Sequence, residues 1–467
     1  MKYAVITFGC RVNQADSLAF EEQLQARGLE ATDADAADLV IVNTCSVTAS
    51  ADQSARQTVR RIARTNPDAR IVVTGCYATR RPDEVDALPN VVRIVPNTQK
   101  SGFVTVIEDL GLTTAERFAD GDGGCGASIE PGMAGRTAFT LRVQTGCAES
   151  CTYCIIPSTR GAPQSIDPAT LIREIERIAA AGFKEIALTG VHLGSYGRDL
   201  SPATSLLELL TLIADAAPEQ TRFRISSLEP MECTEAIVDL VAASPVFARH
   251  FHLPLQHASD RILSAMRRPY TRADYDRLVE RIRRLIPEAA IGTDVIVGFP
   301  GETDEDFSRL SGYLSASPVT HVHVFPYSDR PGTVASTMTP KVGGGAIRER
   351  ARGVRDISRR LNQRFRVSQV GAVHRALTID DGTTAVTGNY LKLRIPEGHR
   401  RNEWLQVKVV GGVDPMEGCV IQSALKGDGG ESLRWRIEPA LDDQLAAGRA
   451  DVAPSALSHR NDDTPLG

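Results

Sequence analysis

Three cysteines within eight residues constrain this chain more than any other feature of its sequence. They form the segment Cys147-Ala-Glu-Ser-Cys151-Thr-Tyr-Cys154, a C-x3-C-x2-C spacing with no fourth Cys or His beside it. Cubane iron–sulfur clusters take thiolate ligands, so a set of three leaves one iron free to bind a cofactor. The alternative is a zinc site, but a structural zinc usually takes four protein ligands. The spacing therefore favours a 4Fe-4S cluster with one open iron.

The composition is that of a globular protein with several domains. The chain has 467 residues, of which 42% are hydrophobic and 24% charged, and such a length predicts about two to four domains. Nine Cys, odd in number and spread along the chain, favour metal ligation in a reducing cytosol over a disulfide framework. No apolar run approaches the roughly 20 residues that cross a bilayer, and the N-terminus is strand-like rather than a signal peptide, so we expect a cytoplasmic protein without a membrane partner. A net charge of −5 means that any nucleic-acid surface must be a local basic patch.

Residues 1–112 are expected to form an α/β domain. Short apolar runs alternate there with stretches of helical period, which indicates a parallel sheet flanked by helices. The expected strands are 3–7, 39–42, 71–74 and 91–95, and the expected helices are 15–27 and 51–64. Residues 113–136 lose this periodicity and are rich in Gly, Ala and Asp, which is typical of a linker.

A second series of strands and helices occupies residues 137–366. Its strands are expected at 139–144, 184–189, 222–226, 250–253, 290–297 and 320–325. About six βα units predict a partial (βα)6 barrel, in which loops at the C-terminal ends of the strands carry function. The three-cysteine loop follows the first strand, where such a barrel holds its cofactor.

The remainder of the chain is expected to be β-rich and then disordered. Residues 346–366 form a helix with eight Arg against only Glu349 and Asp356. Residues 367–437 predict a small barrel of about five strands. Residues 438–467 have no apolar period and are expected to be a disordered tail.

Three further cysteines follow strands of the first domain. Cys10, Cys45 and Cys76 each stand at the C-terminal end of an expected strand, and in a parallel sheet these ends meet at one edge. We therefore expect a second metal centre there, the alternative being three separate buried thiols. The other cysteines, Cys125, Cys233 and Cys419, are isolated and are interpreted as non-ligands.

The combined motifs resemble the radical S-adenosylmethionine (SAM) methylthiotransferase family over about residues 1–437. The segments that carry the resemblance are Gly9–Gln14, Asn43–Cys45, Gly75–Tyr77, Cys147–Cys154, Ser226–Pro230, His252–Gln256, Met266–Arg268, Thr293–Thr303 and His323–Thr333. Cys10–Gln14 and Thr44–Thr48 are most similar to the branch that modifies threonylcarbamoyladenosine beside the anticodon of tRNA. Alternatives are the branches that act on isopentenyladenosine or on a ribosomal protein residue, and a non-catalytic, metal-stabilised RNA-binding protein.

The resemblance implies two 4Fe-4S clusters and SAM as cofactors. It also implies that six cysteines ligate the clusters and act as catalytic residues. Cys147, Cys151 and Cys154 would hold the cluster that cleaves SAM to methionine and a 5′-deoxyadenosyl radical. Cys10, Cys45 and Cys76 would hold the auxiliary cluster that carries the sulfur. An electron donor of flavodoxin or ferredoxin type and a sulfur donor are implied as partners, whereas the oligomeric state is unknown.

Six residues at strand ends and in the cysteine loop are candidates for contacts with SAM. They are Tyr153, Thr189, Gly190, Ser227, Glu229 and Gly298. Each has a simpler interpretation as well, because aromatic residues usually pack in cores and polar loop residues are usually solvated. Likewise, Asn13 and Asn43 either bond cluster sulfurs or satisfy their own turns.

The RNA partner is expected to be a tRNA anticodon stem-loop. The small β-barrel resembles the TRAM domain of the family, and Tyr390 and Trp404 are candidates for base stacking, with core packing the alternative for Trp404. The helix at 346–366 would contact phosphates. Four positions depart from the family pattern, namely Thr79, Pro96, Ile166 and His257. The departures at Thr79, Ile166 and His257 leave contacts to SAM or substrate open.

Overall fold

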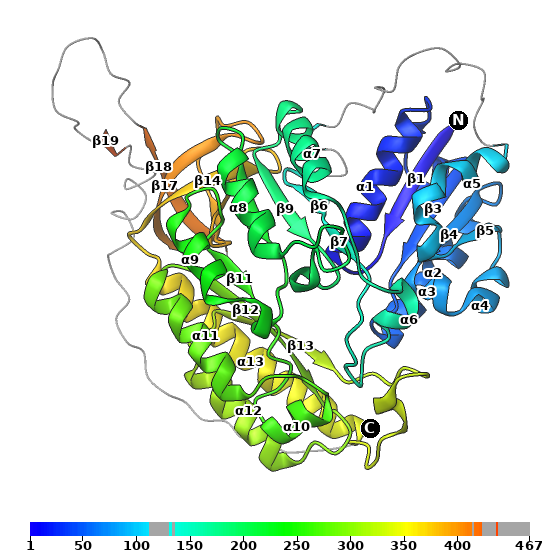
Figure 1. Ribbon diagram of the computed structural model, residues 1–467. Coiled ribbons are helices and arrows are strands. Elements are labelled where there is room, and N and C mark those ends of the chain that lie inside the picture. The colour runs from blue at the N-terminus through cyan, green and yellow to red at the C-terminus, as the bar shows by residue number, and fades with distance from the viewer. Residues whose placement is uncertain (112–129, 133–135, 413–414, 423–435, 438–467) are drawn as a thin grey trace, which may run out of the picture.

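A computed structural model describes residues 1–111, 130–132, 136–412, 415–422 and 436–437 (Figure 1). An N-terminal α/β domain, a six-stranded partial barrel and a small C-terminal β-barrel follow one another along the chain, as the sequence predicts. Most of the expected linker, Cys125 and the expected tail lie outside the described residues. No helix in the described part of the chain is long and apolar enough to span a membrane.

The N-terminal domain is a parallel sheet with strand order β2-β1-β3-β4-β5. Its strands are β1 (Lys2–Thr7), β2 (Glu30–Ala31), β3 (Leu39–Thr44), β4 (Arg70–Gly75) and β5 (Val91–Val95). Its helices are α1 (Arg11–Gln25), α2 (Ala49–Thr65), α3 (Cys76–Arg80), α4 (Pro82–Asp86) and α5 (Phe103–Asp109). The four expected strands and two expected helices are confirmed.

Alternate residues of the central strands build two separate cores. Val40 and Val42 of β3 pack with α2 on one face of the sheet, whereas Leu39 and Ile41 pack with α1 and α5 on the other. Because successive side chains of a strand point to opposite faces, β3 must be apolar throughout its first four positions. This burial on both faces fixes where the strand ends lie.

The second domain is a partial barrel of six parallel strands. They are β6 (Phe139–Arg142), β9 (Glu185–Thr189), β10 (Arg222–Ile225), β11 (His250–His252), β12 (Ala290–Val297) and β13 (His321–Pro326). Two three-stranded sheets are joined by the parallel bridges Phe223–Phe247 and Ser227–His252. All six expected strands are therefore confirmed.

Helices and short elements complete the barrel. The outer helices are α7 (Pro168–Ala180), α8 (Leu206–Ala216), α9 (Glu235–Ala243), α11 (Arg272–Leu285), α12 (Asp304–Ala316) and α13 (Gly344–Ser368). Shorter elements are β7 (Gln144–Thr145), α6 (Ile156–Arg160), β8 (Gln164–Ser165) and α10 (Asp260–Ala265). The strand residues that face the helices are apolar and belong to one core.

The C-terminal region is a closed β-barrel. Its strands are β14 (Val373–Ile379), β15 (Thr384–Thr387), β16 (Lys392–Arg394), β17 (Trp404–Gly412), β18 (Met416–Gln422) and β19 (Arg436–Ile437). β14 to β18 form the expected five-stranded barrel, because β16 pairs with β18 and closes the sheet. β19 adds a short sixth strand to the edge of β18.

Buried charged side chains of the six-stranded barrel bind the small C-terminal barrel. Arg222 and Arg224 of β10 both bind Glu185 of β9 and donate to the carbonyl oxygens of Val386 and Gly388 at 3.1 and 2.8 Å. Although burial alone would raise it, the two guanidinium groups lower the pKa of Glu185 to about 2. Glu185 therefore stays ionised and holds both arginines in place.

The two aromatic residues considered for base stacking lie at this same junction. Trp404 donates to the Gln220 carbonyl oxygen at 2.8 Å, and Arg222 lies over its ring. The Tyr390 ring packs against His250 with a centroid separation of 4.5 Å, and the Arg224 guanidinium lies 3.7 Å from its centroid. Both rings thus serve contacts between domains in this structure.

Candidate active site between two domains

Cys10, Cys45 and Cys76 lie at one edge of the N-terminal sheet. Cys10 precedes α1, Cys45 follows β3, and Cys76 begins α3 directly after β4. Because β1, β3 and β4 are adjacent and parallel, their C-terminal ends bring these thiols together. Burial, together with the neighbouring Cys10 and Cys76 thiols, raises the pKa of Cys45 to about 11. The expectation that the three residues meet at one sheet edge is confirmed.

Two glycines allow the chain to approach this group of thiols. Gly9 has φ +89°, and a Cβ placed on it would lie 2.5 Å from the Cys45 Sγ. Gly75 has φ +95°, and its Cβ would lie 2.2 Å from the Thr44 carbonyl oxygen. Glycine at position 9 therefore allows the chain to approach the Cys45 thiol, and glycine at position 75 allows the end of β4 to approach the backbone of β3.

Replacement of Gly9 by Ala is therefore expected to lower the iron content of the reconstituted protein. The left-handed conformation alone costs a non-glycine residue about 1–2 kcal/mol, and the added methyl group collides with Cys45. Gly28→Ala is the matched control, because Gly28 has φ +76° but nothing within 4 Å of the added Cβ. Iron analysis per chain measures the effect, and equal iron in both variants would contradict the assigned role.

Each of the three cysteines of the barrel loop accepts a hydrogen bond. The backbone N–H groups of Glu149 and Ile156 donate to the Sγ atoms of Cys147 and Cys154 at 3.4 and 3.5 Å. The Arg268 guanidinium donates to Cys151 Sγ at 3.1 Å. Hydrogen bonds to sulfur stabilise thiolates and tune the potential of a cluster that they ligate.

A polar framework fixes the loop on its other side. The Gln144 Nε2 donates to the carbonyl oxygens of Thr145 and Gly146 at 2.8 Å, and its Oε1 accepts from the His192 N–H at 2.9 Å. His192 also pairs with Glu232 at 2.9 Å. Although burial would lower it, bonds to Cys147 and Glu232 raise the pKa of His192 to about 9, so a cation lies beside Cys147.

Arg160 links the two sets of cysteines. It leaves the barrel loop at the end of α6 and donates to Asn13 and, at 3.4 Å, to Asp16. Although burial alone would lower the pKa of Arg160, Cys76, Asp16 and Cys10 raise it, Cys76 also through a hydrogen bond. The Asn97 Nδ2 makes a parallel link, at 2.9 Å from the Thr159 carbonyl oxygen and 3.6 Å from the Cys76 Sγ.

Beside the N-terminal set, apart from the thiols, cations outnumber carboxylates, although burial lowers the pKa of one of the cations, Lys100. The Asp16 carboxylate forms ion pairs with three cations. It lies 2.7 Å from the Lys100 Nζ and 3.4 Å from the Arg160 Nη2, and it also pairs with Arg142. Although burial would raise it, these cations lower the pKa of Asp16 to about 2. A surplus of buried positive charge stabilises anionic ligands such as thiolates and an iron–sulfur cluster.

The residues considered for SAM contacts are spread over this end of the barrel. Thr189 is buried, and its carbonyl oxygen accepts from Val143 at 2.9 Å. Ser227 is exposed, and Glu229 pairs with Arg268, which also bonds Cys151. Of these three residues, Glu229 is linked to the cysteine loop, through Arg268.

Three of the candidates make close packing contacts. Tyr153 packs against a core cluster that includes Met266 and Phe299. A Cβ on Gly190 would lie 2.9 Å from Leu193, and one on Gly298 would lie 2.4 Å from Ile347 of α13. Glycine at both positions thus serves the approach of neighbouring side chains.

Asn13 and Asn43 satisfy backbone groups. The Asn13 Nδ2 donates to the carbonyl oxygens of Phe8 and Thr44 at 2.8 and 2.9 Å. The Asn43 Nδ2 donates to the Asn13 carbonyl oxygen at 2.9 Å and to Ser17. Of the two roles considered for these side chains, the structure supports the one in which they order the turns.

Three of the departures from the family pattern have defined places. The Thr79 Oγ1 accepts from the Asn97 N–H at 2.9 Å, so Thr79 positions the residue that reaches Cys76. Ile166 packs against the barrel core. His257 is fully buried, and its Nδ1 accepts from the Ser259 N–H at 2.9 Å; burial lowers its pKa to about 4.

A partial barrel with three cysteines in the loop after its first strand defines a radical SAM enzyme. Residues 141–314 match the radical SAM superfamily, and residues 2–96 match "Uncharacterized protein family UPF0004". Among solved structures, the radical SAM methyltransferase TsrM from Kitasatospora setae aligns with a TM-score of 0.51 at 17% identity, covering 72% of this chain and 73% of that one. That likeness concerns the fold.

Curated relatives define the family more narrowly. A threonylcarbamoyladenosine tRNA methylthiotransferase of Aquifex aeolicus is 36% identical over 86% of this chain and 98% of its own length. Its counterpart from Rickettsia prowazekii is 31% identical over 90% of this chain and 98% of its own length. The chain belongs to the radical SAM methylthiotransferase family, in the branch named for threonylcarbamoyladenosine.

Proposed function

We propose that this protein attaches a methylthio group to carbon 2 of threonylcarbamoyladenosine beside the anticodon of tRNA. The observation that carries the substrate is the similarity to tRNA methylthiotransferases over nearly their whole length. The two sets of three cysteines at one domain junction support the chemistry. In this proposal all six cysteines are ligands, and each set holds one 4Fe-4S cluster.

Membership of the radical SAM superfamily brings SAM and one 4Fe-4S cluster as cofactors. When bound, these groups supply a radical, and the proposed second cluster supplies the sulfur. The chain itself would hold the thiolates, donate hydrogen bonds to them and neutralise their charge. Arg268 would orient Cys151 and Glu229 together, because its guanidinium bonds both.

The link through Arg160 explains how two centres in different domains can act on one substrate. Arg160 binds Asn13 and Asp16 of the N-terminal domain from the barrel loop. Arg330 adds a second link, because its Nη1 pairs with Asp52 at 2.8 Å and its Nε donates to the Val47 carbonyl oxygen at 3.3 Å. These buried contacts would keep the two sets of thiols at a fixed separation, as sulfur transfer to one carbon requires.

We assign the tRNA backbone to one face of α13. Arg348, Arg352, Arg355 and Arg359 recur at helical spacing and are exposed, opposite the buried side that includes Val354 and Leu361. Arg350 is different, because it is buried and paired with Glu302 at 2.9 Å. The exposed stripe is a local basic surface on a chain whose net charge is −5.

Replacement of Arg352 and Arg355 by Ala is expected to weaken the binding of every tRNA to a similar degree, whatever its nucleotide sequence. Removal of one phosphate contact reduces the slope of log K against log salt by about 1, so the slope should fall by roughly 2 in the double variant. Arg277→Ala with Arg309→Ala is the control, because both arginines are exposed and form surface ion pairs on α11 and α12. Fluorescence anisotropy of labelled tRNA at several salt concentrations measures the slope. An unchanged slope would remove α13 from the interface.

The substrate is tested by nucleoside mass spectrometry of tRNA from a strain in which the gene is deleted. Loss of the methylthio form of threonylcarbamoyladenosine, with the unmodified precursor retained, is the expected result. Its persistence would overturn the proposal. Loss of methylthio-isopentenyladenosine instead would assign the protein to that substrate. The electron donor, which we expect to be a flavodoxin or ferredoxin, and the sulfur donor are then identified by supplying each in vitro.

A further inference from the structure

The interior of the six-stranded barrel is polar. On β11, β12 and β13 the side chains that face the helices are apolar, among them Phe251, Val295 and Val322. Because side chains alternate along a strand, His252 and Asp294 are on the opposite face, as is His323. None of these three residues takes part in the chemistry described above.

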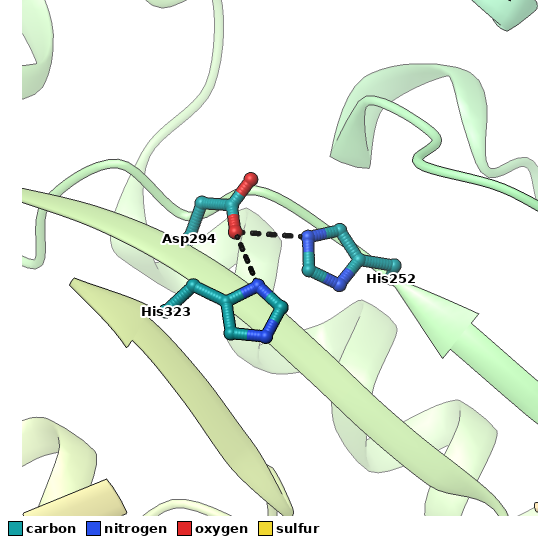
Figure 2. A group of neighbouring side chains, drawn as sticks. All are labelled: His252, Asp294 and His323. Atoms are coloured by element: carbon teal, nitrogen blue, oxygen red, sulfur yellow. Dashed lines mark ion pairs between the residues drawn. The ribbon is translucent and has the colours of Figure 1, made fainter. Parts of the chain in front are cut away.

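These three side chains converge on one point (Figure 2). The strand register pairs Asp294 with His323 and His252 with Gly292, which is two residues before Asp294 on the same face. Gly292 makes room for the rings of two histidines, because a Cβ on it would lie 2.3 Å from the His321 Nε2 and 2.8 Å from the His252 Nδ1. The absence of a side chain at position 292 allows the His252 ring to reach the Asp294 carboxylate on β12.

The distances suit a single metal ion. The His252 Nε2 lies 3.0 Å and the His323 Nδ1 lies 3.3 Å from the same atom, Asp294 Oδ1, and the three donor atoms all lie within 4.8 Å of one another. Neighbouring ligands on a metal with bonds of about 2.0–2.2 Å are about 3.0–3.4 Å apart. Both imidazole–carboxylate distances therefore match adjacent positions of one coordination sphere.

Hydrogen bonding accounts less well for this arrangement. Asp294 Oδ1 is buried and, among the described residues, has no partner at hydrogen-bond geometry, although both imidazoles lie at ion-pair distance. A buried acceptor without a hydrogen-bond partner requires an explanation, and a bound metal ion would provide one.

We propose that His252, Asp294 and His323 bind one divalent first-row transition metal ion. Two imidazoles and one carboxylate on one side of a metal leave further positions open, as in the non-haem iron sites with this ligand set. The site is reachable, because the His323 side chain is 59% exposed, whereas His252 and Asp294 are 14% and 22% exposed. The open positions thus face an accessible part of the barrel interior.

The open positions would take oxygen atoms of the modified nucleoside, a step that rests on the proposed function. The threonylcarbamoyl group carries a carboxylate, which is a hard oxygen ligand for such an ion. Direct binding of that carboxylate to the imidazoles is less favourable, because Asp294 already occupies the space between them and like charges repel. A metal ion would bind both carboxylates at once.

Zinc is a suitable probe, because it binds imidazole and carboxylate and does not change oxidation state. The full chain, with its clusters reconstituted under nitrogen, is dialysed against Zn²⁺, and zinc and iron per chain are measured by mass spectrometry. The wild type should retain one zinc more than Asp294→Asn and His323→Gln, with a dissociation constant at least about tenfold lower. Unchanged iron in all samples shows that the clusters are intact.

A control variant and a spectrum separate this site from accidental binding. His399 and Glu403 form a surface His–carboxylate pair at 3.5 Å, so His399→Gln should leave the bound zinc unchanged. X-ray absorption at the zinc edge should show nitrogen and oxygen ligands without sulfur. Equal zinc in the wild type and both site variants, no zinc in any, or sulfur bound to the zinc would each overturn the proposal. Because tRNA is not needed for these measurements, their failure leaves the proposed methylthio transfer untouched.

Discussion

Replacement of Cys76 by Ala is expected to abolish methylthio transfer while SAM cleavage continues. Cys76 is one of three thiols at the edge of the N-terminal sheet, and two thiolates do not retain a cubane whose fourth iron is already open. Iron should fall from about eight to about four atoms per chain. Product formation should fall by at least about 100-fold, since the sulfur source is lost.

A variant in the other set of cysteines, Cys147→Ala, provides the comparison. Cys147→Ala removes a ligand from the barrel loop and is expected to abolish SAM cleavage, whereas the N-terminal set keeps its iron. Cys233→Ala is the control for loss of a buried thiol, because the Cys233 side chain packs in the barrel core. A Cys76→Ala protein with full iron and full product would show that the N-terminal set is not a cluster site.

The edge position of these cysteines is a consequence of topology, and sequence alone is sufficient to predict it. β3 is apolar from Leu39 to Val42 and buried on both faces, so its assignment to the centre of a parallel sheet follows from its composition. The sequence does not predict β2, because Glu30–Ala31 has only two residues and no apolar pattern. The sheet edge that carries function does not depend on that short strand.

The residues that join the two domains could not be predicted in this way. Asp16 is in an amphipathic helix, where a carboxylate is normally solvated, and its partner Arg160 is 144 positions away. Lys100 lies in a short turn with no motif, yet it is buried against Asp16. Pairings of this kind depend on how the domains pack, and no local periodicity encodes them.

The same limit applies to Arg268 and Tyr390. Arg268 is part of a recognised motif, but its contact with Cys151 follows from the way that the loop after α10 returns to the cysteine loop. Tyr390 is a candidate for base stacking from its sequence, and the structure places its ring against His250 and Arg224. A motif identifies a residue as special, whereas its partner is known only from the fold.

Replacement of Asp16 by Asn is expected to destabilise the domain junction and to change the electronic properties of the N-terminal set. Asn keeps the shape of the side chain but leaves Lys100 and Arg160 buried without a counter-charge. Removal of one partner of a buried pair costs about 3–5 kcal/mol. Urea unfolding of the reconstituted chain under nitrogen measures the loss. Asp356→Asn is the matched control, because its pair with Arg359 is exposed and is expected to contribute about 0–1 kcal/mol.

The sign of the electronic effect follows from the charges. Asp16 is ionised, as its pKa of about 2 indicates, so Asn at this position removes one negative charge from the surroundings of Cys10 and Cys76. Reduction adds an electron to a cluster, and positive surroundings stabilise the reduced form. A redox titration followed by electron paramagnetic resonance should therefore show a more positive potential for the N-terminal cluster, with the barrel cluster shifted less. A potential that becomes more negative would mean that Lys100 or Arg160 leaves the junction once Asp16 is lost, and the fixed link between the two domains would have to be abandoned.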